Sequence, residues 1–177
     1  MQREFIKREF DTKVVEIKRV TRVVAGGKRM RFRALVVIGD KVSRVGVGLK
    51  KGADVAEAVA KATAAAKKRM IKVAITKEGT IPHSVKIKYK AAYVLLKPAK
   101  SGSGIIAGGP VRAVVSLAGI KNISSKMLGS TNKVSNVRAA FEGLRGLKPR
   151  DVSPPTVPDA SGGGQGAPIS QEGETPR

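Results

Sequence analysis

The side chains best placed to do chemistry in this sequence are cations grouped around glycines. The segment Ala25-Gly26-Gly27 interrupts a run of β-branched residues, and cations stand on both sides of it: Arg19, Arg22, Lys28, Arg29 and Arg31. Two adjacent glycines let the backbone turn tightly, because glycine tolerates positive φ angles at little cost. The segment therefore predicts a hairpin tip that points cations at phosphates, with an ordinary solvated turn as the alternative.

A second glycine-rich segment covers residues 101–109. Within it, residues 102–107 have the spacing G-x-G-x-x-A of a dinucleotide-binding loop, but no Asp or Glu follows about 20 residues later to hold a ribose. A helix expected to begin at Pro110 would present backbone N–H groups to a phosphate, near Lys97, Lys100 and Arg112. Two interpretations stay open: contact with phosphate, or a tight loop that needs glycine for its geometry.

Groups suited to acid–base catalysis or metal binding are scarce. No carboxylate occurs between Glu78 and Glu142, His83 is the only histidine, and cysteine is absent. Residues 79–141 therefore lack paired carboxylates and oxygen ligands for magnesium, and the chain has no thiolate ligand. We expect a protein that is not an enzyme and that has no cofactor and no metal.

The net charge indicates the class of partner. The 177 residues carry 35 Lys and Arg against 13 Asp and Glu, a net charge of +22; residues 151–177 carry −3, which leaves +25 on the first 150. Such a positive charge favours binding to a polyanion, and nucleic acid is the most common polyanion in cells. Aromatic residues are only 3%, so phosphates, sugars and shape are expected to matter more than base stacking. With no apolar run of roughly 20 residues and no signal peptide, we expect no membrane partner and a cytoplasmic location.

The pattern of residues 14–75 predicts a three-stranded sheet with one helix. β-branched and alternating residues place the strands at 14–24, 31–38 and 45–49. Gly46 and Gly48 leave one face of the third strand bare, so that a helix or an RNA backbone can come close. An Asp–Glu capping box begins a helix that apolar periodicity extends over residues 55–73.

After a linker at residues 77–80 the pattern starts again. It predicts strands at 84–88 and 92–97, a helix from 110 to 118, an extended segment at 120–128 and a last helix after residue 132. From Pro149 onward the sequence is rich in Pro and Gly and predicts disorder. We therefore expect an α+β protein in four parts: an N-terminal extension 1–13, a first domain 14–77, a second domain 78–148 and an acidic tail 149–177.

Several motifs taken together resemble one protein family. They are residues 19–27 (RVTRVVAGG), 45–48 (VGVG), 104–109 (GIIAGG), 129–132 (GSTN) and 137–139 (VRA). Their order and spacing over about residues 14–147 are similar to those of bacterial small-subunit ribosomal protein five. The resemblance implies a first domain with a double-stranded-RNA-binding-like fold, a second domain with a left-handed βαβ-type fold, and a structural role in the small ribosomal subunit.

The resemblance also implies partners. These are small-subunit ribosomal RNA, the small-subunit proteins four and eight with three as a further neighbour, and messenger RNA at the channel through which it enters. It implies that the hairpin at residues 24–29 approaches RNA near the spectinomycin site, and that Gly104 and Arg112 face protein four and affect decoding accuracy. The residues expected to contact RNA are Arg19, Arg22, Gly26, Gly27, Lys28, Arg29, Arg31, Lys50, Lys51, Lys97, Lys100, Gly108, Gly109, Ser130, Thr131, Asn132 and Arg138.

Two other functions stay open from the sequence. A free-standing double-stranded-RNA-binding protein would not need its second domain to bind its partner. A small-molecule phosphotransferase, suggested by fold analogy alone, would need the metal-binding carboxylates that residues 79–141 lack. The sequence departs from the family's usual pattern at four positions, where aromatic residues, a glycine and a proline are common: Val47, Leu49, Lys50 and Lys133.

Overall fold

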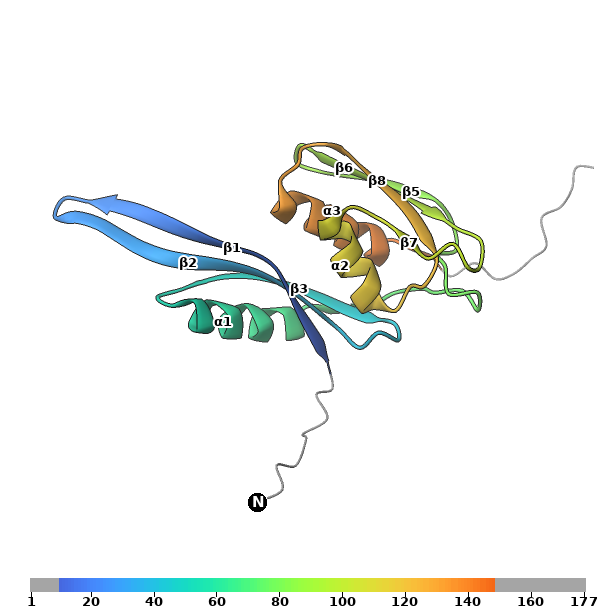
Figure 1. Ribbon diagram of the computed structural model, residues 1–177, viewed down its shortest axis with the longest axis horizontal. Coiled ribbons are helices and arrows are strands. Elements are labelled where there is room, and N and C mark those ends of the chain that lie inside the picture. Colours follow the sequence, from blue (N-terminus) through green and yellow to red (C-terminus); the bar gives the residue numbers. More distant parts are fainter. Residues whose placement is uncertain (1–9, 149–177) are drawn as a thin grey trace, which may run out of the picture.

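Residues 10–148 are described by a computed structural model, and they form two sheets and three helices in layers (Figure 1). The first sheet is antiparallel, in the order β1-β2-β3-β4, and its strands are β1 (Asp11–Val24), β2 (Gly27–Gly39), β3 (Arg44–Gly52) and β4 (Met70–Lys72). Helix α1 (Val55–Lys67) lies on one face of this sheet. Its N-cap is Asp54, whose side chain accepts a hydrogen bond from the N–H of Ala56.

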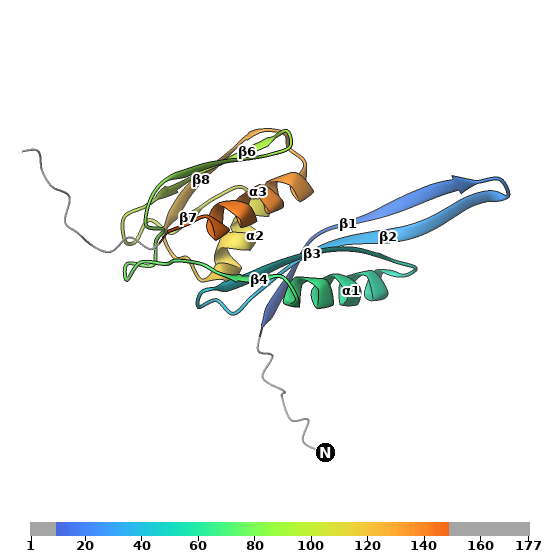
Figure 2. The ribbon, with the colours of Figure 1, turned by 180° about the vertical axis from the view of Figure 1, so that it is seen from behind.

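The second sheet has the order β5-β6-β8-β7. Its strands are β5 (Val85–Tyr89), β6 (Ala92–Pro98), β7 (Ile105–Ile106) and β8 (Ile123–Gly129). β7 and β8 are parallel and are joined through helix α2 (Gly109–Ala118), whereas the other pairs are antiparallel. Helices α2 and α3 (Lys133–Arg145) lie between the two sheets, and Figure 2 shows them on the opposite side of the first sheet from α1. The expected α+β class with two domains is confirmed.

Two expectations about the first domain are wrong. β1 begins at Asp11, three residues before the expected strand, and α1 ends at Lys67 instead of continuing to residue 73. After the basic run Lys67-Lys68-Arg69, which suits the negative end of a helix, the chain turns and pairs with β3 as β4. The sheet therefore has four strands. Apolar periodicity missed β4 because a short apolar run fits a helix and a strand equally well.

The C-terminal half of β2 and the part of β3 beside it are buried on both faces of the first sheet. On the α1 side, alternate residues of β2 pack against the alanines of the helix: Ala34, Val36 and Ile38 on Ala58, Ala62 and Ala66. On the other side, the intervening residues join a core that continues into the second domain, with Leu35, Val37 and Val45 packed among residues such as Val111, Val115 and Leu117. The two domains therefore share one core, and the first domain cannot lose the second without exposing it.

Glycines allow α1 to lie directly on β3. A Cβ atom at Gly46 would sit 2.5 Å from the carbonyl oxygen of Ala66, and one at Gly48 would overlap the carbonyl oxygen of Ala62. The sequence left open whether a helix or an RNA backbone comes close to Gly46 and Gly48. In the structure, helix α1 covers this face of β3. Within residues 10–148, no helix is long and apolar enough to cross a membrane. The extension before residue 10 and the tail from residue 149 lie outside the described residues.

Candidate nucleic-acid interface

Residues 18–33 form a hairpin arm that extends beyond the rest of the first sheet (Figure 1). Register pairs Val24 with Gly27 at the tip and Lys18 with Arg33 at the base. Only Phe32 and Arg33 of this segment also pair with β3, so nearly the whole arm has no third strand beside it. A positive φ is expected for both tip glycines: Gly27 has one, at +135°, but Gly26 does not, so the expectation is wrong for Gly26.

One face of the arm carries a row of cations. Side chains of directly paired residues point to the same side, and alternate residues of a strand share a face. By this rule Arg29, Arg31 and Arg33 of β2 lie on the same side as Lys18 and Arg22 of β1. Lys51 of β3 pairs with Arg33 and extends the row across a third strand. We call the group Lys18, Arg22, Arg29, Arg31, Arg33 and Lys51 the basic face.

The basic face places like charges directly opposite one another. The pairs are Lys18–Arg33, Arg22–Arg29 and Arg33–Lys51. Among residues 10–148, Lys18 is the only member of this face that forms an ion pair. Like charges facing each other across strands are destabilising, so this arrangement is suited to a partner that brings negative charge.

Two members of the basic face, Lys18 and Arg33, were not predicted from the sequence. The alternation of Arg29, Arg31 and Arg33 in β2 contained the signal, since residues two apart share a face of a strand. Conversely, two predicted RNA contacts do not lie on it. Arg19 pairs with Phe32, and Lys28 with Val23, which places both cations on the side of α1.

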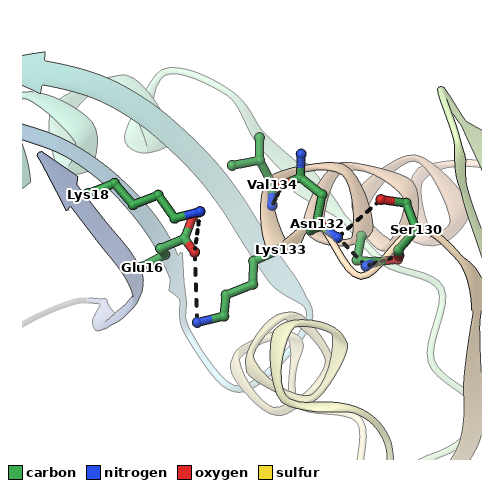
Figure 3. Close-up of polar contacts among 7 residues, drawn as sticks. Glu16, Lys18, Ser130, Asn132, Lys133 and Val134 are labelled. Atoms are coloured by element: carbon green, nitrogen blue, oxygen red, sulfur yellow. Dashed lines mark hydrogen bonds and ion pairs between the residues drawn. The ribbon is translucent and has the colours of Figure 1, made fainter. Parts of the chain in front are cut away.

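At the base of the arm, Glu16 connects the two domains. Its carboxylate lies 3.5 Å from the Lys18 Nζ and 3.8 Å from the Nζ of Lys133, the first residue of α3 (Figure 3). Only 11% of the Glu16 side chain is exposed. A cation in the first turn of a helix is disfavoured by the helix dipole, so the carboxylate offsets both that repulsion and the charge of the basic face.

The predicted RNA contacts at the start of α3 have structural roles. Asn132 is the N-cap, and its Oδ1 accepts a hydrogen bond from the N–H of Val134 at 3.1 Å. The Ser130 hydroxyl accepts a hydrogen bond from the Asn132 N–H (Figure 3). The amide of the buried Asn136 donates to the backbone oxygens of both Ser130 and Asn132. Of the three predicted residues 130–132, Thr131 is the one whose side chain makes none of these hydrogen bonds.

The loop of residues 101–109 is held from inside. The side-chain oxygen of Asn122, a residue 7% exposed, accepts hydrogen bonds from the N–H groups of Gly102 and Gly104 at 3.1 and 3.2 Å. The Asn122 amide then donates to the carbonyl oxygen of Glu78. The N–H groups of these two glycines are therefore already used, and both residues have positive φ. The tight-loop interpretation therefore holds for Gly102 and Gly104. Asn122 has no signal in the sequence, because its partners lie up to 44 residues away.

The remaining predicted residues fall in two other places. Lys97, Lys100, Gly104, Gly109 and Arg112 lie in or beside the loop before α2, in the second domain. A Cβ atom at the neighbouring Gly108 would meet the side chain of Met127. The other two residues, Lys50 and Arg138, line a cavity between the domains. The structure thus divides the predicted contacts among four regions: the hairpin arm, the start of α3, the loop before α2 and the cavity.

An α+β fold with a projecting hairpin and a row of cations, of which only Lys18 forms an ion pair among residues 10–148, is typical of a protein that binds the charged backbone of a polyanion. Comparison with known proteins identifies the family. Residues 10–74 match ribosomal protein S5, N-terminal domain, and residues 87–152 match ribosomal protein S5, C-terminal domain. The chain is also 49% identical over 140 residues to the small ribosomal subunit protein uS5c of Rhodomonas salina, which covers 79% of this chain and 83% of that protein. The chain belongs to the ribosomal protein S5 family.

Membership in this family gives the general function of the chain. The chain is a structural protein of the small ribosomal subunit that binds ribosomal RNA and takes part in translation. The family resemblance carried by the sequence motifs is therefore confirmed, together with the two-domain α+β class. The family is one of structural, non-enzymatic ribosomal proteins.

Proposed function

We propose that the basic face is the main RNA contact of this protein within the small subunit. The observation that carries the proposal is the row of like charges across three strands, from Lys18 through Arg33 to Lys51. The row is stabilised only when anions lie against it, and consecutive phosphates of an RNA backbone supply such anions. Recognition then follows charge and shape, in keeping with an arm whose only aromatic residue is Phe32.

The test compares two double variants that remove equal charge from opposite faces of the arm. Arg22→Ala with Arg29→Ala removes two members of the basic face, and Arg19→Ala with Lys28→Ala removes two cations from the side of α1. Binding to a duplex fragment of small-subunit RNA is measured over a range of salt concentrations. The first variant is expected to lower the slope of log K against log salt by about two, and the second by less than one. Equal slopes for the two variants would contradict the proposal.

We further propose the finer roles implied by the family resemblance. Arg112 is exposed on the first turn of α2, and Gly104 is half-exposed in the loop before it, so both are available to a neighbouring protein. The expected neighbours are small-subunit proteins four and eight, with three beside the channel where messenger RNA enters, and the expected effect is on decoding accuracy. Cells that carry Arg112→Glu as the only copy should show altered stop-codon readthrough with normal subunit yield. Unchanged readthrough would argue against this role.

The alternative of a free-standing RNA-binding protein is tested by fractionation. The shared core of Leu35, Val37 and Val45 with the second domain supports one inseparable unit. Tagged full-length chain should sediment with small subunits and should stay there at moderate salt. Recovery mainly in the soluble fraction would favour the alternative. The cytoplasmic location stays a prediction, and imaging of the tagged chain in its source cell would test it.

A further inference from the structure

Strand β3 has an open edge in the part of the chain that the structure describes. β2 pairs with β3 along residues 45–52, but on the other side β4 pairs only with residues 44–46. Residues 47–52 therefore present backbone N–H and C=O groups with no neighbouring strand. Such an edge is a template for a further strand, and proteins commonly cover or blunt it. Six residues correspond to about 20 Å of edge at 3.3 Å per residue.

The open edge lies in a cavity of about 650 Å³ between the two domains. Residues 47–50 of β3 line one side, with the end of α1 beside them, and β5 and α3 form the opposite wall. Part of the lining is apolar and half-buried, notably Leu49, Ile71 and Phe141. The cavity therefore offers both an unpaired backbone and apolar surface for side chains, which is what an added strand requires.

The charged groups around the cavity are mostly positive. Lys50, Arg69, Arg138 and Arg145 face one carboxylate, Glu142. That carboxylate lies 3.7 Å from the Arg145 guanidinium, and the Arg138 guanidinium donates a hydrogen bond to the Tyr89 hydroxyl at 2.7 Å. Neither Lys50 nor Arg69 has an ion-pair partner among residues 10–148. The charge balance favours a negatively charged occupant.

We propose that this cavity, the edge groove, binds an extended acidic segment of another protein, which adds a strand to β3. A peptide backbone satisfies the alternating N–H and C=O groups of the edge, and its alternate side chains can place carboxylates near Lys50, Arg69 and Arg145 and apolar groups on Leu49 and Phe141. RNA would use the same cations but would leave the edge unpaired. The edge groove adjoins the basic face at Lys51 of β3, but the cations that line the groove are not those of the hairpin arm, so the protein would bind RNA and a peptide mainly through different residues.

The proposal is tested with a labelled decapeptide of alternating valine and glutamate. The full chain should bind it, and a lysine-for-glutamate version should not bind. Arg69→Gln with Arg145→Gln should weaken binding at least tenfold, whereas the matched control Lys86→Gln with Lys126→Gln, on the outer face of the second sheet, should change it less than twofold. Peptide binding should also slow hydrogen exchange at alternate amides of residues 47–51.

Strand addition is distinguished from charge attraction by blocking the peptide backbone. Methylation of alternate peptide nitrogens removes hydrogen-bond donors without changing charge, and it should abolish binding. Equal binding of the methylated peptide would overturn the proposal. So would a marked gain in peptide affinity when Asp151, Asp159, Glu172 and Glu174 are made neutral, because the occupant would then be this chain's own tail. If the Arg69→Gln, Arg145→Gln variant lost as much affinity for an RNA duplex as for the peptide, the groove would be assigned to RNA instead.

Discussion

The first sheet has glycines at two places with opposite surroundings, the tip of the hairpin arm and strand β3 beneath α1. At Gly26 and Gly27, a Cβ atom would meet nothing within 4 Å. At Gly48, the same atom would overlap the backbone of Ala62. Glycine at the tip provides backbone freedom in open space, whereas glycine in β3 removes a side chain so that a helix can touch the strand. The hairpin arm can therefore change its shape at little cost in stability, whereas β3 beneath α1 cannot.

The largest effect is expected where the helix touches the strand. Gly48→Ala forces the α1 backbone away from β3 and should reduce the free energy of unfolding by at least about 3 kcal/mol, roughly 10 °C in Tm. Gly26→Ala is the matched control and should leave Tm nearly unchanged, because its Cβ enters open space. Thermal unfolding of the two full-length variants measures the difference. Similar Tm values would show that the contrast between the two places is wrong.

The next effect concerns the turn at the other end of β2. Burial of Asp40 by itself raises its pKa, but hydrogen bonds from the N–H groups of Arg44, Ser43 and Val42 and from the Arg44 guanidinium hold the pKa well below its ordinary value of 3.8. A lowered pKa in the folded state adds stability above the unfolded value, and this stability is lost as the pH falls. Asp40→Asn should cost about 2 kcal/mol at pH 7 and much less near pH 2. A cost independent of pH would contradict the assigned role of the carboxylate.

A smaller effect on stability is expected at the tip. Gly27→Val is strained because the φ of Gly27 is +135°, but the tip can change its turn without disturbing any packed group. The loss of stability should stay within about 1 kcal/mol, while the position of the tip changes. Following the family resemblance, cells with this variant as the only copy should assemble subunits and show altered spectinomycin sensitivity. Unfolding of the isolated variant would mean that the tip belongs to the core.

The smallest effect has the opposite sign. Arg22→Ala with Arg29→Ala removes a repulsive pair, so the protein without RNA should gain a few tenths of a kcal/mol of stability while losing RNA affinity. Urea unfolding with and without a bound RNA duplex measures both. Loss of stability in the protein without RNA would show that the basic face contributes to folding.

The two kinds of glycine show how far the sequence predicts this structure. Alternation and capping residues predicted the longer strands and the start of α1, because those signals are local, but they missed the short strands β4 and β7. The bare face at Gly46 and Gly48 was also predicted, but the identity of its neighbour was not, since a helix and an RNA backbone both need close approach. Only the fold places Ala62 and Ala66 there.

The candidate site divides in the same way. The cations near the tip were predicted from composition and a turn signal, but their division between two faces depends on the strand register, which charge alone does not reveal. The phosphate hypothesis for Gly102 and Gly104 failed because Asn122 arrives from a distant part of the chain. Long-range partners of this kind have no local signature.

Strand β2 also gives the molecule a mechanical property. Its 13 residues span about 43 Å without interruption, from the exposed tip at Gly27 to Gly39, which touches the backbone of Leu117 in α2. The middle of the strand packs against α1 on one face and against the second domain on the other. We expect this packed middle to oppose a displacement of the tip by RNA, and the end of α2 is the part of the second domain that β2 reaches.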